Sequence, residues 1–245
     1  MLEAISHRKL PQQVLDMEDV LTSCVFGTLV REEFRSLYLM PFLRQAQNLN
    51  GDRPLQGIPE GVQINVSFWP WLQGNEQGCQ PDVVIDFKEH AKLMVEAKHL
   101  SGKSNRIIDI DEEQSASCEV DCLDDLRDKV ILYADQLTRE WDVLLNTCQS
   151  THSQFLVYLT AHHSFPYSDV AESLKEIGST VTREIMERGL LWLSWRDLYS
   201  LLEMRRDRDI ENLWRYMNHL GLYRVREVCT PRPVTWRYQG KKAAQ

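Results

Sequence analysis

The sequence lacks any long apolar run, and this absence limits the classes of protein to which it can belong. No stretch of about 18 consecutive apolar residues occurs in the chain, so we expect no membrane-spanning helix. The first ten residues also lack the apolar segment and the small-residue cleavage site of a secretory signal peptide. We therefore expect a cytoplasmic protein with no membrane association.

Closely spaced cysteines are missing as well. The chain has six cysteines, none of them in a CxxC pair, and only Cys118 and Cys122 lie near each other. Zinc and iron–sulfur sites in proteins use closely spaced thiolates, so this spacing favours scattered, reduced and mostly buried thiols.

Positive charge is scarce in most of the chain. The 28 basic and 36 acidic residues give a net charge of −8, which is unfavourable for a protein that meets nucleic acid. Residues 205–245 differ, because they carry ten basic and four acidic side chains, a net charge of +6, and leave residues 1–204 at −14. A basic end on an acidic body is typical of a nucleic-acid footprint, and equally of a solvated helix with a loose tail.

Hydrophobic periodicity predicts helices and strands in a defined order. Apolar residues recur every three or four positions in the expected helices, which span residues 16–30, 31–47, 123–146, 168–187, 196–204 and 209–219. Pro41 leaves a kink open in the second of them. Alternating or continuous apolar runs predict strands over residues 62–68, 83–85, 93–95, 155–159 and 190–193. Three meander strands followed by helix-linked strands indicate an α/β fold with a mixed central sheet flanked by helices.

The length of the chain allows one sizeable core with a small appendage. We expect the core over residues 1–204. Residues 205–245 are expected to form a basic C-terminal helix and tail, packed on or beside that core.

Three charged residues lie at the ends of two neighbouring predicted strands. Asp82 opens one strand, and Glu96 and Lys98 close the next. Because side chains alternate between faces, Glu96 and Lys98 share a face, and a short turn at residues 88–91 places Asp82 opposite them. Such a set suits phosphodiester hydrolysis: carboxylates hold Mg²⁺, the metal lowers the pKa of a bound water, and the lysine orients that water or offsets developing charge.

The residues Pro81-Asp82 and Glu96-Ala97-Lys98 resemble the PD-(D/E)xK pattern of the restriction-endonuclease-like nucleases. The order of predicted elements over residues 16–195 is also similar to the core of that superfamily. The resemblance implies that Asp82 and Glu96 bind Mg²⁺ or Mn²⁺ and that Lys98 supports the attacking water. The alternative interpretation is that Asp82 caps a turn while Glu96 and Lys98 form a surface pair.

The resemblance implies two further site residues. Many members have a metal-binding glutamate on the helix before the sheet, and Glu18 is the best candidate here, although it equally suits a first-turn acid beside the helix dipole. Exonuclease-like members have a catalytic-site glutamine that opens the helix after the third strand, and Gln136 resembles it. Glu140 stands where that motif carries tyrosine, so the branch stays open, and Gln136 equally suits an ordinary helix surface.

Other polar residues are weaker candidates. His99, Lys103 and Arg106 follow Lys98 and could meet the phosphates of the cleaved strand, or could be ordinary loop residues. The pair His162-His163 follows a predicted strand, but it has no partner at metal-ligand spacing.

As a whole, the resemblance implies a metal-dependent hydrolase, an endonuclease or an exonuclease. DNA is favoured as its substrate, and RNA is left open. The superfamily serves restriction, recombination, repair and antiviral defence, and a chain with few added recognition elements suggests a subunit beside an ATPase or a targeting protein. A homo-oligomer is left open. The alternative is a catalytically weak member that serves assembly or nucleic-acid binding, against which the intact Asp82, Glu96 and Lys98 argue.

Nine acidic residues between positions 109 and 128 conflict with the approach of a polyanion. Their repulsion reaches about 10 Å at ~0.1 M salt. One hypothesis is that this segment holds the free protein in a low-activity state until a partner moves it. The other is a solvated loop that points away from the site.

Overall fold

A five-stranded mixed sheet forms the centre of the computed structural model, which describes residue 14 and residues 17–74, 78–99, 135–147, 153–177, 180–203 and 207–223. Its spatial order is β1-β4-β5-β6-β7. The β1–β4 and β4–β5 pairs are antiparallel, and the β5–β6 and β6–β7 pairs are parallel. The strands are β1 (Asn65–Phe68), β4 (Val83–Phe87), β5 (Ala91–Ala97), β6 (Ser153–Thr160) and β7 (Leu190–Ser194).

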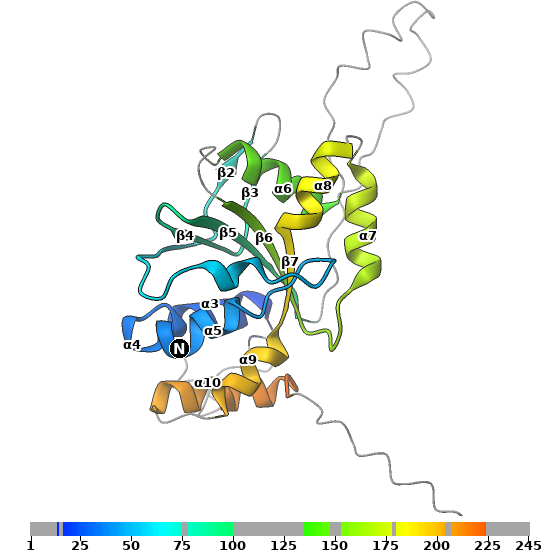
Figure 1. Cartoon of the computed structure of the whole chain (residues 1–245). Helices are drawn as coiled ribbons and strands as arrows, with labels where there is room; N and C mark the ends of the chain where they lie inside the picture. The colour runs from blue at the N-terminus through cyan, green and yellow to red at the C-terminus, as the bar shows by residue number, and fades with distance from the viewer. Residues whose placement is uncertain are drawn as a thin grey trace, which may run out of the picture.

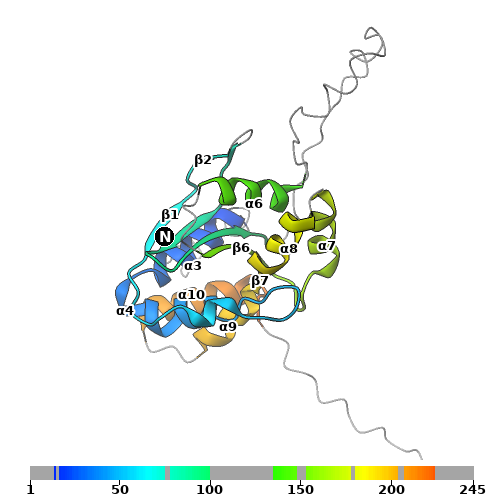
Figure 2. The ribbon, with the colours of Figure 1, turned by 45° about the horizontal axis from the view of Figure 1, so that its top comes forward.

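Helices cover both faces of this sheet (Figures 1 and 2). One face packs against α3 (Glu18–Leu29), α5 (Met40–Leu43), α9 (Trp195–Leu202) and α10 (Arg208–His219). The other face packs against α6 (Gln136–Thr147), α7 (Tyr167–Glu176) and α8 (Thr180–Gly189). The expected α/β architecture, a mixed sheet flanked by helices, is confirmed.

The strand period divides the core into two apolar clusters. Leu93, Val95 and Ala97 of β5 belong to the cluster with α3, α9 and α10, whereas Met94 belongs to the cluster with α6. Because both faces of β4–β7 are covered, these strands are apolar along most of their length. The edge of β7 is paired in turn with the loop after α5, through two backbone hydrogen bonds between Gln47 and Trp192.

The helix expected over residues 31–47 is divided into three short pieces and ends earlier than expected. The chain forms the short helix α4 (Glu32–Phe34), the π-helix η1 (Arg35–Leu39) and then α5, which ends at Leu43. Pro41 has no backbone N–H and its ring crowds the preceding turn, so the regular ladder is interrupted there. In the wider turn the Met40 N–H donates to the carbonyl of Arg35.

Two other expectations need correction. The expected helix over residues 168–187 is two helices, α7 and α8, because the chain leaves helical geometry at Ile177, just before Gly178, a poor helix former. The segment expected as a turn, residues 70–80, contains a small hairpin of β2 (Leu72–Gln73) and β3 (Gly78–Cys79), which packs against α6.

The beginning of α6 is set by a helix cap. The carboxylate of Asp135 accepts a hydrogen bond from the backbone N–H of Thr138 at 3.1 Å, as an N-capping residue does. The expected helix over residues 123–146 is therefore found from Gln136 onward, and its earlier part lies outside the described residues, as do the acidic segment 109–128, Lys103 and Arg106.

The C-terminal helix α10 lies on the core. Ile210, Leu213 and Met217 are buried in the same cluster as α3, and Arg31 pairs with Asp209 at 2.7 Å. Residues 224–245, which include most of the basic tail, lie outside the described part of the chain. Within the described ranges, no helix has both the length and the apolar character needed to cross a bilayer.

Two glycine substitutions, one of them a control, test the packing of α6 against the end of α8. A Cβ atom added at Gly189 would lie 2.2 Å from the buried ring of Trp141, so Gly189→Ala is expected to destabilise the fold by about 1–3 kcal/mol. In the control Gly27→Ala, on the exposed side of α3, the added methyl meets no atom within 4 Å, and better helix propensity should stabilise by about 0.5–1 kcal/mol. Urea unfolding measures both; equal changes would contradict the packing.

Candidate active site

The candidate site begins at one end of the β4–β5 pair. Val83 pairs with Val95, so Asp82 comes opposite Glu96 and on the same face of the sheet. The Oδ2 atom of Asp82 accepts a hydrogen bond from the backbone N–H of Ala97 at 2.8 Å. The pairing of the two strands thus brings the two acidic residues together, as the short turn between the strands predicts.

Lys98 lies between two carboxylates. Its Nζ atom is 2.6 Å from Oε1 of Glu96 and 3.2 Å from Oε1 of Glu18. The other oxygen of Glu18 accepts a hydrogen bond from the backbone N–H of His99 at 2.8 Å. The first turn of α3, on the opposite side of the sheet from α6, is thereby joined to the end of β5.

Backbone and ring contacts hold the chain at Lys98. The Lys98 N–H donates to the carbonyl of Leu159 at 2.7 Å, which extends the β5–β6 pairing past the end of β5. The Lys98 carbonyl accepts a hydrogen bond from the indole N–H of Trp195 at 3.2 Å. Trp195 is itself fully buried, so the main chain at this point is fixed by the core.

The first turns of α6 complete the cluster. Gln136 and Glu140 are four residues apart and therefore lie on the same face of the helix. The Nε2 atom of Gln136 donates to Oε1 of Glu96 at 2.5 Å and to Oε1 of Glu140 at 3.0 Å. All five predicted site residues therefore lie together at one end of the sheet: Asp82, Glu96, Lys98, Glu18 and Gln136.

The cluster has more buried acidic groups than basic ones. Burial, and then the charge of Glu96, raise the pKa of Asp82 to about 7, although the hydrogen bond from Ala97 and the charge of Lys98 lower it. Burial and Glu96 also raise the pKa of Glu140 well above its ordinary value. Burial lowers the pKa of Lys98, but the nearby charges of Glu96 and Glu18 outweigh this effect, so the amine stays protonated.

The donor atoms of the cluster suit a hard divalent cation. Carboxylate oxygens from Asp82 and Glu96 are ligands that Mg²⁺ and Mn²⁺ accept, and Mg²⁺ in proteins commonly takes one or two carboxylates and several waters. A cation would also offset the repulsion that raises the pKa of Asp82. As the side chains stand, the described residues contain no group of three or more His, Cys, Asp or Glu placed to hold a metal.

Sequence reasoning did not assign a role in the site to Glu140 or Cys79. Glu140 lies one helical turn after Gln136, and this spacing could have indicated a shared face. Cys79 belongs to the hairpin next to the site, where burial and the charges of Glu140 and Glu96 raise the pKa of its thiol to about 12. With so high a pKa the thiol is protonated at neutral pH and is a poor nucleophile.

The hydrogen bonds of His162 are made with residues outside the carboxylate cluster. The His162 N–H donates to the hydroxyl of Thr160 at 3.3 Å, and the His162 carbonyl accepts from the hydroxyl of Ser194 at 2.7 Å. These contacts fix the loop after β6 at the start of α9. They give His162 a role in the main-chain structure of this corner.

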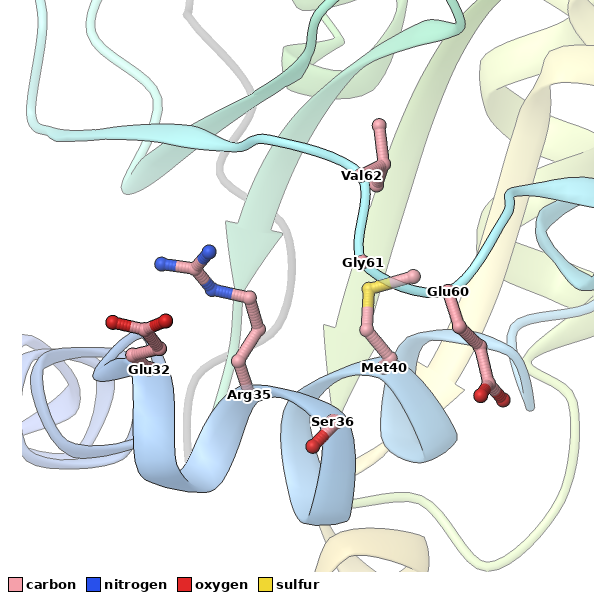
Figure 3. A pocket seen from close by; sticks show the side chains of 7 residues that line it. All are labelled: Glu32, Arg35, Ser36, Met40, Glu60, Gly61 and Val62. Carbon is pink, nitrogen blue, oxygen red and sulfur yellow. The ribbon is translucent and has the colours of Figure 1, made fainter.

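A surface pocket lies away from the carboxylate cluster. Its cavity of about 220 Å³ lies between η1 and the chain leading into β1, with Arg35, Met40 and Val62 among its lining residues (Figure 3). Val62 precedes the Asn65 end of β1, whereas the other end, at Phe68, pairs with Val83 beside Asp82. The pocket is lined by none of the predicted site residues.

Comparison with models of protein families, with curated proteins and with solved structures gave no match for this chain.

The raised pKa of Asp82 predicts a gain in stability on removing its charge. The folded-state pKa of about 7 exceeds the ordinary value of 3.8, so stability from this carboxyl is fully present below about pH 4 and is lost as the pH rises through 7. Asp82→Asn keeps an acceptor for Ala97 and removes the charge. At about pH 8, without divalent cations, the variant should be more stable by at least about 1 kcal/mol.

Thermal unfolding at two pH values checks this expectation. The gain should shrink strongly at about pH 4, where the wild-type carboxyl is protonated in the folded state and already about half protonated in the unfolded state. Equal shifts at both pH values would show that the charge of Asp82 is not the cause.

Proposed function

We propose that the chain is a metal-dependent nuclease that hydrolyses phosphodiester bonds with Mg²⁺ or Mn²⁺, on a restriction-endonuclease-like core. The observation that carries the proposal is the convergence of Asp82, Glu96, Lys98 and Glu18 at one end of the sheet, with more buried negative charge than the single lysine offsets. A site that tolerates this imbalance is suited to a cationic ligand.

The proposed roles follow from the contacts of each side chain. Asp82 and Glu96 would hold the cation, which when bound polarises the phosphate and makes a coordinated water more acidic. Lys98 is kept protonated by Glu96 and Glu18, so it acts as a hydrogen-bond donor and a positive charge rather than as a base. Its ammonium would orient the attacking water or offset charge on the phosphate.

Glu18 has two candidate roles. It holds the ammonium of Lys98 and the backbone of His99, and both contacts position the lysine. It is also the third carboxylate of the cluster, so it could ligate the cation, as the resemblance implies. The contacts favour the positioning role in the present arrangement.

DNA is the proposed substrate, in preference to RNA. By analogy with the superfamily, we propose a cytoplasmic nuclease subunit of a defence, restriction or repair system, with a partner such as an ATPase or a targeting protein. One observation favours a second candidate, a catalytically weak subunit for assembly or nucleic-acid binding: the described residues hold no three-residue group placed to bind a metal.

Alanine substitutions separate the two candidates. Asp82→Ala, Glu96→Ala and Lys98→Ala should each lower Mg²⁺-dependent cleavage of plasmid and single-stranded DNA at least about 100-fold, because each removes a group that acts on the cation, water or phosphate. The exposed Glu33→Ala on α4 is the control. Near-wild-type activity in two of the three variants would contradict the assignment of these residues to the active site. An inactive wild type would favour the second candidate, the binding subunit.

Glu18→Gln separates the two roles of Glu18. As a metal ligand, its change should raise the Mg²⁺ concentration that gives half-maximal activity. As a partner of Lys98 only, its change should lower kcat at saturating Mg²⁺ and leave that concentration unchanged, since the lysine loses an anionic partner. Mg²⁺ titrations of the initial rate decide between these results.

A further inference from the structure

Glu140 is a buried carboxyl for which the proposed chemistry does not yet account. It is only 1% exposed and lies on α6 next to Leu137, Trp141 and Leu144, which are part of the apolar core. A carboxyl in such a place is costly unless it is hydrogen-bonded. A residue with a packing role alone would be apolar here.

The contacts of Glu140 lead to two groups of the cluster, the amide of Gln136 and the carboxyl of Glu96. Its Oε1 atom accepts from Nε2 of Gln136 at 3.0 Å, whereas its Oε2 atom has no hydrogen-bond donor. Its carboxyl also lies in hydrogen-bonding contact with that of Glu96. Glu140 thus belongs to the carboxylate cluster, although it is farther inside the protein.

The Gln136 amide connects the two carboxylates. A primary amide carries two N–H groups, and the same nitrogen donates to Glu96 at 2.5 Å and to Glu140 at 3.0 Å. Two acceptors fix the position of this nitrogen better than one. Because Lys98 also donates to Oε1 of Glu96, that oxygen accepts two hydrogen bonds, and the orientation of the Glu96 carboxylate is defined.

We propose that Glu140 is a positioning residue of the nuclease site, which holds the Gln136 amide and through it fixes the Glu96 carboxylate. This inference rests on the proposed function and deepens it. The part of Glu140 that matters is its acceptor oxygen toward Gln136. A glutamine at position 140 keeps that acceptor, and an alanine does not.

A double-mutant cycle tests the proposal. Glu140→Ala and Gln136→Ala should each lower kcat for DNA cleavage about 10- to 100-fold, with KM little changed, because both release the same carboxylate. The double variant should be no slower than Gln136→Ala alone. Glu140→Gln should retain near-wild-type kcat, and Glu184→Ala, an exposed acid on α8, is the control.

Mn²⁺ binding, measured by calorimetry, adds a readout that is independent of turnover. Glu140→Ala and Gln136→Ala should weaken it to the same extent, and Glu140→Gln should leave it unchanged. Thermal unfolding of each variant identifies any loss of fold. A packing role would instead make the Glu140→Ala loss follow the drop in unfolding temperature and add to that of Gln136→Ala.

Three results would overturn the inference. They are a Glu140→Gln variant as slow as Glu140→Ala, a double variant much slower than Gln136→Ala, and a Glu140→Ala variant with wild-type cleavage and Mn²⁺ affinity. In each of these the wild type still cleaves DNA, so the proposed function stands. A wild type that neither binds Mn²⁺ nor cleaves DNA overturns the proposed function and this inference together.

Discussion

The register between β4 and β5 is the constraint on which the candidate site depends. Val83 pairs with Val95, and this alignment places Asp82 beside Glu96. A slip by one residue would move one acid to the opposite face of the sheet, because side chains alternate between faces. The apolar residues of both strands oppose the slip, since it would move Val83, Ile85 and Phe87, which are fully buried in one cluster, to the opposite face of the sheet. The same hydrophobic contacts that stabilise the sheet therefore align the two carboxylates.

A second constraint is electrostatic and opposes stability. Asp82, Glu96 and Glu140 are all buried. The charge of Lys98 acts on Asp82 and Glu96 and is shared with Glu18, whereas the charge of Arg139 acts on Glu140. The raised pKa values of Asp82 and Glu140 express the cost of this arrangement. The surrounding core tolerates it because α3, α6 and the ends of β5 and β6 are each anchored by apolar packing. Destabilising electrostatics of this kind are typical of functional sites, where a bound ligand or substrate supplies the opposite charge.

Much of the fold was predictable from periodicity. The helix expected over residues 16–30 is α3, and the expected strands over 83–85, 93–95 and 190–193 lie within β4, β5 and β7. Periodicity did not predict the backbone conformation where a single residue or a distant contact determines it. Pro41 turns the preceding residues into a π-helix, and the hairpin β2–β3 has strands of only two residues, held by packing against α6 rather than by a pattern of their own.

The sequence alone determined which residues are candidates and which strand ends they occupy, because a period of two and a short turn are local properties. Asp82, Glu96 and Lys98 could be named on that basis. Only the tertiary structure decided that Glu18, 80 residues before Lys98, contacts it, and that Gln136 reaches Glu96 from a helix on the other face. It also decided the burial of Glu140. These contacts join residues far apart in the chain, and their distances depend on how helices pack on the sheet, which no local pattern specifies.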